Sequence, residues 1–205
     1  MSRFAPLLRL GLVGLAGLLV SPALFAAGIS TTNKYAWAEN AGWLNFNATH
    51  GNVQVYNDHL EGYAWAENLG WIRLGSYTGG GTHPYGNTTA ANYGVNHDGN
   101  GHLSGYAWSE NAGWLNFQGV TVDRITGGFD GYAWGENIGY LHLHNAASPA
   151  YQVAVIDADN DGYSALSDCN DSAAAIHPGA AEVCDRQDND CNPTTVERCP
   201  LGCPQ

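Results

Sequence analysis

The chain has 205 residues and a formal net charge of −12, although only 13% of its residues are charged. Such an acidic chain repels phosphate backbones and anionic headgroups, which argues against nucleic-acid binding through a basic face and against a polybasic role at a membrane surface. Aromatic residues make up 11% of the chain, too many for simple disorder, and the length suffices for one core with a small appendage.

The first 27 residues predict a secretory signal peptide. Arg3 and Arg9 give a positive start, an apolar run covers Leu10 to Val20, and small residues follow at Ala26 and Ala27. The run is too short to span a bilayer, and no other stretch is apolar enough to be transmembrane. We therefore expect cleavage near Ala26 or Ala27 and a product that is secreted or held at a cell surface.

Residues 28–150 contain four copies of one aromatic repeat, and all seven Trp lie inside these copies. A Gly/Thr/Asn-rich insertion at about residues 76–90 separates the second copy from the third. In each copy Asn and Gly lie between two short aromatic runs, and both residues tolerate positive φ, so each copy predicts a β-hairpin. The copies are Tyr35–Phe46 (YAWAENAGWLNF), Tyr63–Leu74 (YAWAENLGWIRL), Tyr106–Phe117 (YAWSENAGWLNF) and Tyr132–Leu143 (YAWGENIGYLHL).

Short alternating segments precede the later copies and predict further strands, for example at Val53–Tyr56 and Val120–Val122. No helical periodicity accompanies them. We therefore expect an all-β fold of four aromatic hairpin repeats, followed by a small loop-rich module stabilised by metal and disulfides. The pattern leaves three arrangements of the repeats open: a solenoid, a prism and a closed barrel.

The alternation of side chains along a strand predicts which residues of each hairpin face the core. If the loop is Glu39–Gly42, Trp37 faces Leu44 and Tyr35 faces Phe46. We then expect the Tyr, Trp, Leu and Phe of each copy to form the core face.

The opposite face carries a recurrent aromatic residue beside small ones, at Trp43, Trp71, Trp114 and Tyr140, of which the three Trp are the candidate stacking platforms. We favour packing of these rings against the neighbouring repeat, because repeats need such contacts to be stable. Stacking on the sugar rings of a polysaccharide is the alternative. The recurrent Glu-Asn pair also has two interpretations, a structural role in the turn, which we favour, and cation binding.

No catalytic motif is present in the sequence, which has no Gly-x-Ser-x-Gly, no phosphate loop and no His-Glu-x-x-His. His142 and His144 point to one side of a strand, but a two-His pair without a third ligand is more typical of solvated histidines than of a transition-metal site. We therefore expect no enzymatic activity.

The composition changes at Tyr151, since residues 151–205 hold ten acidic residues and all five Cys but no Trp. This second module begins with the ligand spacing of a calcium loop, with carboxylates at positions 1, 3, 5 and 12 and Gly at position 6. Asp at position 12 and Ala at position 9 predict a weak site, suited to extracellular calcium. The candidate ligands are Asp157, Asp159, Asp161, the backbone carbonyl of Tyr163, and Asp168.

The stretch from Asp157 to Asn192 closely resembles the metal-binding motif family of bacterial secreted and surface proteins that is named after the copper-associated MopE group. The shared features are an Asp-x-Asp-x-Asp-Gly-Tyr start, Asp-Cys-x-Asp, Pro-Gly-Ala-x-Glu-x-Cys-Asp and a closing Asp-Asn-x-Cys. The chain departs from the pattern at Arg186, where Gly is usual, and after Asn192. The resemblance implies metal binding without enzymatic activity and adds four candidate ligands: Asp171, Asp185, Asp188 and Asp190.

The donor types favour calcium, because calcium prefers hard carboxylates whereas copper prefers His, Met or thiolate, and Met1 is the only Met. Five Cys in an exported chain predict disulfides, with zinc ligation by the last two as the alternative. An odd number leaves one thiol free or paired with another chain. The candidates are Cys169, Cys184, Cys191, Cys199 and Cys203.

Together these patterns predict a secreted or cell-surface protein with a structural or interaction role and a calcium-binding C-terminal motif. Its partner is a second copy of itself, another protein or a surface polysaccharide. A carbohydrate-binding module and a copper-binding surface protein are the alternatives.

Overall fold

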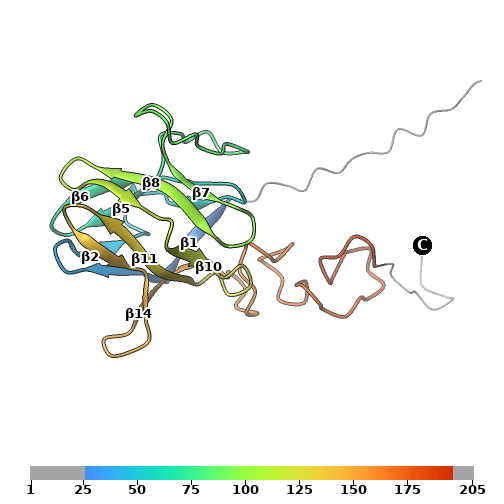
Figure 1. Cartoon of the computed structure of the whole chain (residues 1–205). Coiled ribbons are helices and arrows are strands. Elements are labelled where there is room, and N and C mark those ends of the chain that lie inside the picture. The colour runs from blue at the N-terminus through green and yellow to red at the C-terminus, as the bar shows by residue number, and fades with distance from the viewer. Residues whose placement is uncertain (1–25, 196–205) are drawn as a thin grey trace, which may run out of the picture.

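The computed structural model describes residues 26–195, and within this range the protein is all-β, as predicted (Figure 1). The range contains fourteen strands and no helix, hence no helix suited to crossing a membrane. Residues 1–25 of the predicted signal peptide lie outside it, and Ala27 already belongs to β1. The strands are β1 (Ala27–Ala38), β2 (Gly42–Asn45), β3 (Gln54–Val55), β4 (Leu60–Glu61), β5 (Tyr63–Ala66), β6 (Gly70–Arg73), β7 (Val95–His97), β8 (Leu103–Ser109), β9 (Gly113–Asn116), β10 (Val120–Val122), β11 (Phe129–Gly135), β12 (Gly139–His142), β13 (His144–Asn145) and β14 (Tyr151–Val155).

Each repeat forms a hairpin whose loop has three residues. In the first copy Ala38 pairs with Gly42, and the Ala41 N–H donates to the Ala38 carbonyl at 3.2 Å. Gly42 has a φ of 72°, a conformation that side-chain-bearing residues rarely adopt. A tight turn closed by a left-handed glycine is a common three-residue hairpin connection, which explains why each copy carries Gly at this position.

The register expected from a four-residue loop is wrong by one residue, because Trp37 faces Trp43 rather than Leu44. A slip of one residue moves every side chain of the second strand to the other face. Leu44 points inward as expected, but it shares the inner face with Ala36, whereas Tyr35 and Trp37 lie outside, 39% and 36% exposed. The predicted core face is therefore right for the Leu and Phe of the copy, which are buried, and wrong for its Tyr and Trp, which lie outside.

The four hairpins close into an eight-stranded barrel, one of the three arrangements that the sequence left open (Figure 1). The strand order is β1-β2-β5-β6-β8-β9-β11-β12, and β12 pairs back with β1 through His142 and Trp37. Closure removes the free edges that an open sheet would expose.

Small residues from the first strand of each hairpin and large residues from the second fill the barrel. An eight-stranded barrel has just enough interior for side chains, so Ala opposite Leu or Ile fills it without overpacking. The fully buried large residues of the second strands and their ends are Leu44, Phe46, Ile72, Leu74, Leu115, Phe117, Leu141 and Leu143.

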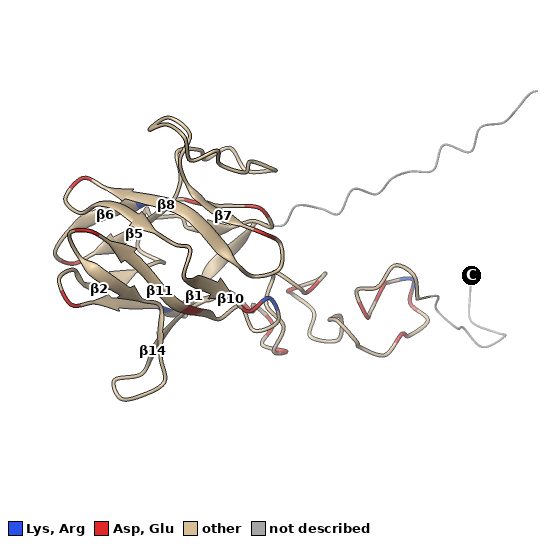
Figure 2. Cartoon of the chain, in the orientation of Figure 1, with Lys and Arg blue, Asp and Glu red and all other residues tan. Residues whose placement is uncertain are grey.

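The Asn of the Glu-Asn pair joins its own turn to a neighbouring turn. The Asn40 side-chain amide donates to the Ile138 carbonyl at 3.3 Å and so connects the first hairpin to the last. This supports a structural role for the Asn, while the glutamates mark the hairpin tips in Figure 2. The same bond recurs from Asn111 to Leu69 (2.9 Å) and from Asn137 to Ala112 (3.0 Å).

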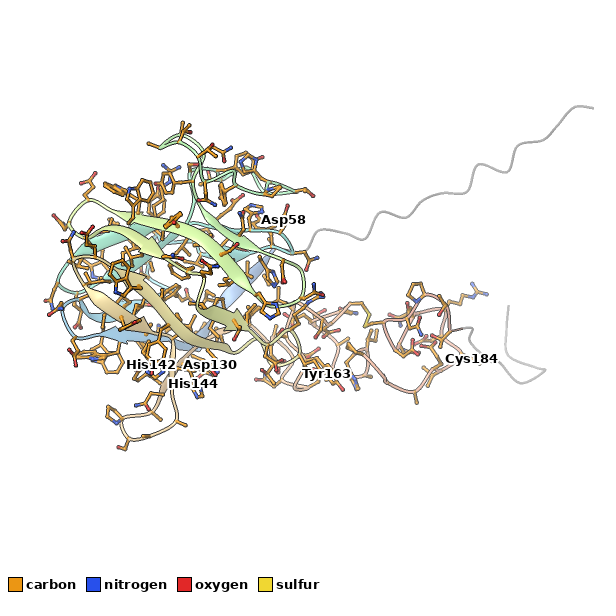
Figure 3. All side chains as sticks on the ribbon, in the orientation of Figure 1. Asp58, Asp130, His142, His144, Tyr163 and Cys184 are labelled. Atoms are coloured by element: carbon orange, nitrogen blue, oxygen red, sulfur yellow. A yellow bond between two sulfur atoms is a disulfide. The ribbon has the colours of Figure 1, made fainter. Side chains whose placement is uncertain are left out.

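The insertion after β6 folds over a buried charged cluster that the sequence did not reveal. His59 is fully buried, with Nδ1 2.6 Å from Asp58 Oδ1 and Nε2 3.0 Å from Glu61 Oε1. The other Asp58 oxygen accepts the His83 N–H at 2.8 Å, and Glu61 Oε1 accepts the Gly80 N–H at 2.8 Å. The carboxylates of Asp58, labelled in Figure 3, and of Glu61 therefore fasten the insertion to the β3–β4 hairpin.

Strand β14 belongs to the sheet, although it lies after the domain boundary predicted at residue 151. Val153 pairs with Lys34, and Val155 pairs with Ile29 of β1. The acidic segment begins two residues beyond β14 and extends away from the barrel end opposite the hairpin turns (Figure 1). The division into residues 28–150 and 151–205 stays a prediction.

Candidate metal site

The acidic loop that follows β14 is joined at its C-terminal end to the segment after β10. The Ser164 hydroxyl donates to the Arg124 carbonyl at 2.9 Å, and Arg124 Nη2 donates to the Leu166 carbonyl at 3.1 Å. The Ala165 N–H also donates to the Ile156 carbonyl at 3.0 Å, which brings the two ends of the loop together. The acidic residues are thus presented from a loop with anchored ends.

The sequence folds into a tight loop because its first carboxylate binds the loop's own backbone. Asp157 Oδ1 accepts the Asn160 N–H at 2.7 Å, and Asp157 Oδ2 accepts the Gly162 N–H at 3.0 Å. Gly162 has a φ of 96°, which the sharp turn requires. Asp161 Oδ1 accepts the Tyr163 N–H at 2.8 Å, so each of these aspartates also shapes the backbone.

Three carboxylates of the loop converge on one point. One oxygen from each of Asp159, Asp161 and Asp168 lies within 4.8 Å of the others. Their Oδ2 atoms are all buried and have no hydrogen-bond partner in the described part of the chain. Burial raises the pKa of Asp168, and the charges of Asp161 and Asp159 raise it further. Buried, unpaired and mutually repelling carboxylate oxygens are the arrangement that a bound cation would satisfy.

Asp171 joins this group from outside the loop. Asp157, Asp159 and Asp171 form a second set of oxygens within 4.8 Å of one another, and it shares Asp159 with the first. Burial raises the pKa of Asp171, as do the nearby charges of Asp168, Asp159 and Asp157. Five of the predicted ligands therefore surround one acidic centre, which we call the loop site: Asp157, Asp159, Asp161, Asp168 and Asp171.

A separate acidic group lies further along the segment and has a different character. Glu182, Asp188 and Asp190 each offer an oxygen within 4.8 Å of the others. Glu182 Oε1 already accepts the Asp190 N–H at 2.8 Å. A hydrogen bond from the Thr195 hydroxyl is the first of the causes that lower the pKa of the half-buried Asp190. One oxygen of each carboxylate accepts a hydrogen bond from the chain, and none of the three is among the described side chains with a buried, unpartnered oxygen, unlike the loop site.

Two of the predicted ligands, Asp185 and the carbonyl of Tyr163, are not shown to face a common point with other ligands among the described residues. Asp185 accepts bonds from the Gln187 N–H (2.9 Å) and side-chain amide (3.0 Å), and it belongs to none of the ligand groups among residues 26–195. The Tyr163 ring stacks on His177 with ring centroids 4.6 Å apart, and its carbonyl as a ligand stays a prediction. Glu182 was not among the predicted ligands, although it is the only Glu inside the Pro-Gly-Ala-x-Glu-x-Cys-Asp pattern.

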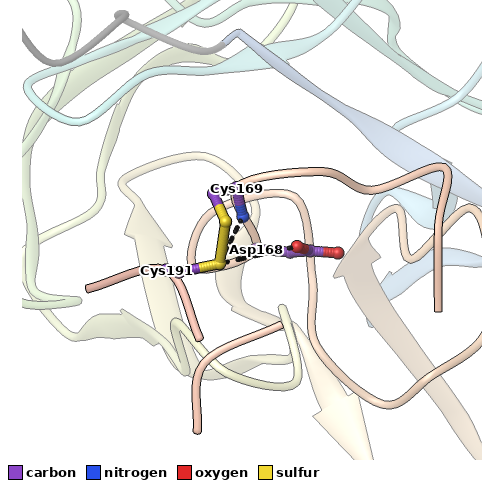
Figure 4. A group of neighbouring side chains, drawn as sticks. All are labelled: Asp168, Cys169 and Cys191. Carbon is purple, nitrogen blue, oxygen red and sulfur yellow. Dashed lines mark hydrogen bonds between the residues drawn. A yellow bond between two sulfur atoms is a disulfide. The ribbon is translucent and has the colours of Figure 1, made fainter. Parts of the chain in front are cut away.

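A disulfide joins Cys169 to Cys191 and holds Asp168 beside it (Figure 4). The Cys191 sulfur lies 4.0 Å from Asp168 Oδ1. Sulfurs bonded to each other are not thiolates, so this pair supplies no soft ligand to a metal. Cys184, at the outer part of the segment in Figure 3, is also disulfide-bonded, and Cys199 and Cys203 lie outside the described residues.

A comparison with protein families matches part of this segment to one family. Residues 168–197 match the copper-binding MopE family model, whose description is “Putative metal-binding motif”. The match supports metal binding by the C-terminal segment, in agreement with the resemblance drawn from the sequence. It starts at Asp168, so Asp157, Asp159 and Asp161 of the loop site precede it. Searches of curated proteins and of solved structures give no match to the chain.

The aromatic residues predicted as stacking platforms lie on the outer face of the barrel. Trp71 and Trp114 are 40% and 41% exposed. Trp43 is half-buried, and its ring packs edge-on against Trp37 and against Tyr151, with centroid distances of 4.9 and 5.1 Å. Packing against these rings therefore covers much of the Trp43 side chain, whereas the side chains of Trp71 and Trp114 keep a larger surface open to solvent.

The His142 and His144 pair does not form a metal centre in the described chain. His142 stacks on Tyr132 and lies 3.0 Å from the Tyr151 hydroxyl, whereas His144 lies 3.6 Å from an Asp130 oxygen (Figure 3). Neither belongs to a group of three metal-ligating side chains within residues 26–195.

Proposed function

We propose that the loop site binds Ca²⁺, and that the protein is a secreted or cell-surface protein with a structural or interaction role and no enzymatic activity. The observation that supports the metal most directly is the set of three buried, unpartnered oxygens on Asp159, Asp161 and Asp168. A cation would supply the missing partner for all three at once.

The donor chemistry favours calcium over copper. The loop site offers only carboxylate oxygens, which suit hard cations, whereas copper prefers imidazole, thioether or thiolate. The nearest candidates for softer ligands do not contribute: Cys169 and Cys191 are joined in a disulfide, and His177 belongs to none of the groups of metal-ligating side chains among residues 26–195. A Ca²⁺ ion would also offset the repulsion that raises the pKa of Asp168 and Asp171.

The structural role follows from where the loop is anchored. Because Arg124 and Ser164 join the loop to the barrel, an ion that orders the loop would fix the C-terminal segment relative to the repeats. Without an ion, clustered carboxylates repel one another and the segment loses order.

The burial of His59 supports the absence of an enzymatic role, because the cluster around this residue is the one that most resembles a catalytic site. His59 between Asp58 and Glu61 has the partners of a general base, but its ring is fully buried and cannot reach a substrate. Export is supported by the apolar run Leu10–Val20 after a basic start and by the disulfide between Cys169 and Cys191, which is typical of oxidising compartments.

Native mass spectrometry and calorimetry of the full exported chain test the metal. We expect Ca²⁺ to bind, and D168N to weaken its binding by about tenfold or more, because it removes a charge from the centre of the loop site. The control is D185N, which removes an equal charge from a residue outside the ligand groups and should leave the affinity unchanged.

Limited proteolysis with and without EDTA tests the structural role. We expect chelation to expose the C-terminal segment to protease while the barrel stays resistant. Unchanged resistance of that segment, or retention of copper against an excess of calcium, would contradict the proposal.

A further inference from the structure

The outer face of the barrel carries a cleft that lies apart from the loop site. The cleft has a volume of about 690 Å³ and lies between the second and third hairpins. Its lining includes Trp71 and Arg73 of β6, Trp108 of β8, and Glu110 of the following turn. Pockets of about 300–1,000 Å³ are typical of small-ligand sites, so the cleft fits a short stretch of a ligand rather than the flat surface of a folded protein.

The cleft results from a departure from the repeat. Three copies place Asn45, Asn116 or His142 at the position where the second copy has Arg73, whose Nη2 donates to the Ser76 carbonyl at 2.8 Å. The insertion follows Arg73 in the sequence, and near its end Tyr93 packs against Trp114 of the barrel. The Ser76 N–H donates to the Tyr93 carbonyl at 2.7 Å, which fixes the backbone of this tyrosine.

The aromatic walls of the cleft are held rigid by neighbouring rings. Trp71 meets Trp65 edge-on with centroids 5.0 Å apart, and Tyr63 at 6.1 Å. Tyr93 packs edge-on against Trp114 at 4.9 Å. Rings that are already fixed lose little freedom on binding, which favours affinity per contact. Trp71 nevertheless keeps 40% of its surface exposed.

Tyr93 also borders a second hollow of about 420 Å³, on the side of the third hairpin. This hollow is lined by Tyr106, Trp114 and the insertion residues Asn87 to Ala90. Because both hollows share Tyr93, they adjoin and together suit a ligand with several linked units.

The polar groups of the cleft indicate which ligand it fits. Arg73 donates hydrogen bonds, Glu110 accepts them, and the Asn111 amide does both. One cation and one carboxylate leave the site close to neutral. Sugar rings present apolar C–H faces that pack on aromatic rings, and hydroxyl edges that both donate and accept. We propose that this cleft binds a neutral glycan chain, with Trp71 and Trp108 as stacking platforms and Arg73 and Glu110 as hydroxyl partners.

Titration of the calcium-loaded full chain with neutral hexasaccharides tests this site. The probes are cellohexaose, xylohexaose, mannohexaose and chitohexaose, measured by isothermal calorimetry. We expect at least one to bind, and W71A to weaken that binding by about tenfold or more, because it removes a stacking platform. R73N should also weaken binding, although it only installs the residue that the first and third copies carry at that position.

The matched control is Y140A. Tyr140 occupies the position of Trp71 in the fourth repeat, is 66% exposed and does not line either hollow. It should leave glycan binding unchanged. W71Y, which copies the fourth repeat, keeps the test informative if W71A fails to fold.

Three results would overturn the proposal. They are no binding of any probe at millimolar concentration, equal binding by R73N and the unmodified chain, and a dimer that W71A dissociates without any glycan binding. The cleft lies on the barrel, so binding that survives EDTA supports this site even if the proposed calcium function fails.

Discussion

The side-chain amide of Asn40 donates to the backbone carbonyl of Ile138 at 3.3 Å, across 98 residues of sequence. Asn40 lies in the turn of the first hairpin and Ile138 in the turn of the last. The bond reinforces the β12–β1 pairing that closes the barrel. It has the same form as the bond from Asn111 to Leu69, which joins the turns of the third and second hairpins. The closing junction is therefore built like the internal ones.

This equivalence predicts equal costs for equal substitutions. N40A and N111A each remove one inter-turn hydrogen bond, so each should lower the free energy of unfolding by about 1 kcal/mol. Urea unfolding of the two variants measures this. In an open array of repeats, N40A would cost nothing while N111A kept its effect, so unequal costs of that kind would contradict closure in solution.

The glycine that ends each hairpin turn should tolerate alanine differently in different copies. Gly42 and Gly139 both have a φ of 72°, so alanine at either position costs about 1 kcal/mol in backbone strain. A Cβ at Gly42 would also lie 3.1 Å from Asn68 Nδ2 and 3.2 Å from Glu67 Oε2, whereas one at Gly139 would meet nothing within 4 Å. We expect G42A to be the more destabilising by thermal unfolding. A larger effect of G139A would show that strain and crowding are not the cause.

The hairpins were predictable because their information is local. Asn and Gly between aromatic runs specify a turn within a dozen residues, and the calcium-loop spacing of Asp157 to Asp168 is equally contiguous. The register was not predictable, because Glu-Asn-x-Gly is compatible with loops of three or four residues. Only the packed barrel decides between them, since it accepts Leu44 inside and excludes Trp37.

Contacts between distant segments were also hidden from the sequence. Glu182 joins Asp188 and Asp190 only because the chain folds back on itself there. His59 meets its carboxylates locally, but its complete burial depends on an insertion whose residues show no pattern. The cleft beside Arg73 is lined by several segments that are distant in the sequence, so no single motif predicts it.

His97 makes the stability of the barrel sensitive to acid. Its ring is buried, Nδ1 lies 2.9 Å from the Tyr56 carbonyl, and Nε2 accepts the Gly101 N–H at 3.1 Å, which requires the neutral ring. Burial lowers the pKa of His97, and the charge of Arg124 adds to the effect. The folded protein therefore binds fewer protons here than the unfolded chain does.

The stabilising contribution of His97 is accordingly complete above about pH 6.5, the pKa of an unperturbed histidine, and is lost as the pH falls through the lowered pKa of the folded state. Urea unfolding at pH 7.5 and pH 5 should show a smaller loss in H97Q than in the unmodified protein. H102Q, in which an exposed histidine is replaced, should keep the full loss. An equal pH dependence of H97Q and the parent would exclude this role.

The disulfide should contribute to metal binding through Asp168. Cys169 and Cys191 are 22 residues apart, and opening a loop of that size lowers stability by about 3 kcal/mol. In C169S/C191S, the ion would have to order Asp168 itself, so we expect Ca²⁺ affinity to fall by about tenfold or more. Calorimetry of the variant measures this.

A double-mutant comparison separates a specific effect from general loosening of the segment. If the disulfide acts by positioning Asp168, D168N should cost less Ca²⁺ affinity in the C169S/C191S background than in the parent, because the two changes remove one shared contribution. D157N is the control, since Asp157 is held by the Asn160 and Gly162 N–H groups and should cost the same in both backgrounds. Additive effects of D168N and the cysteine changes would show that the disulfide stabilises the segment without positioning this ligand.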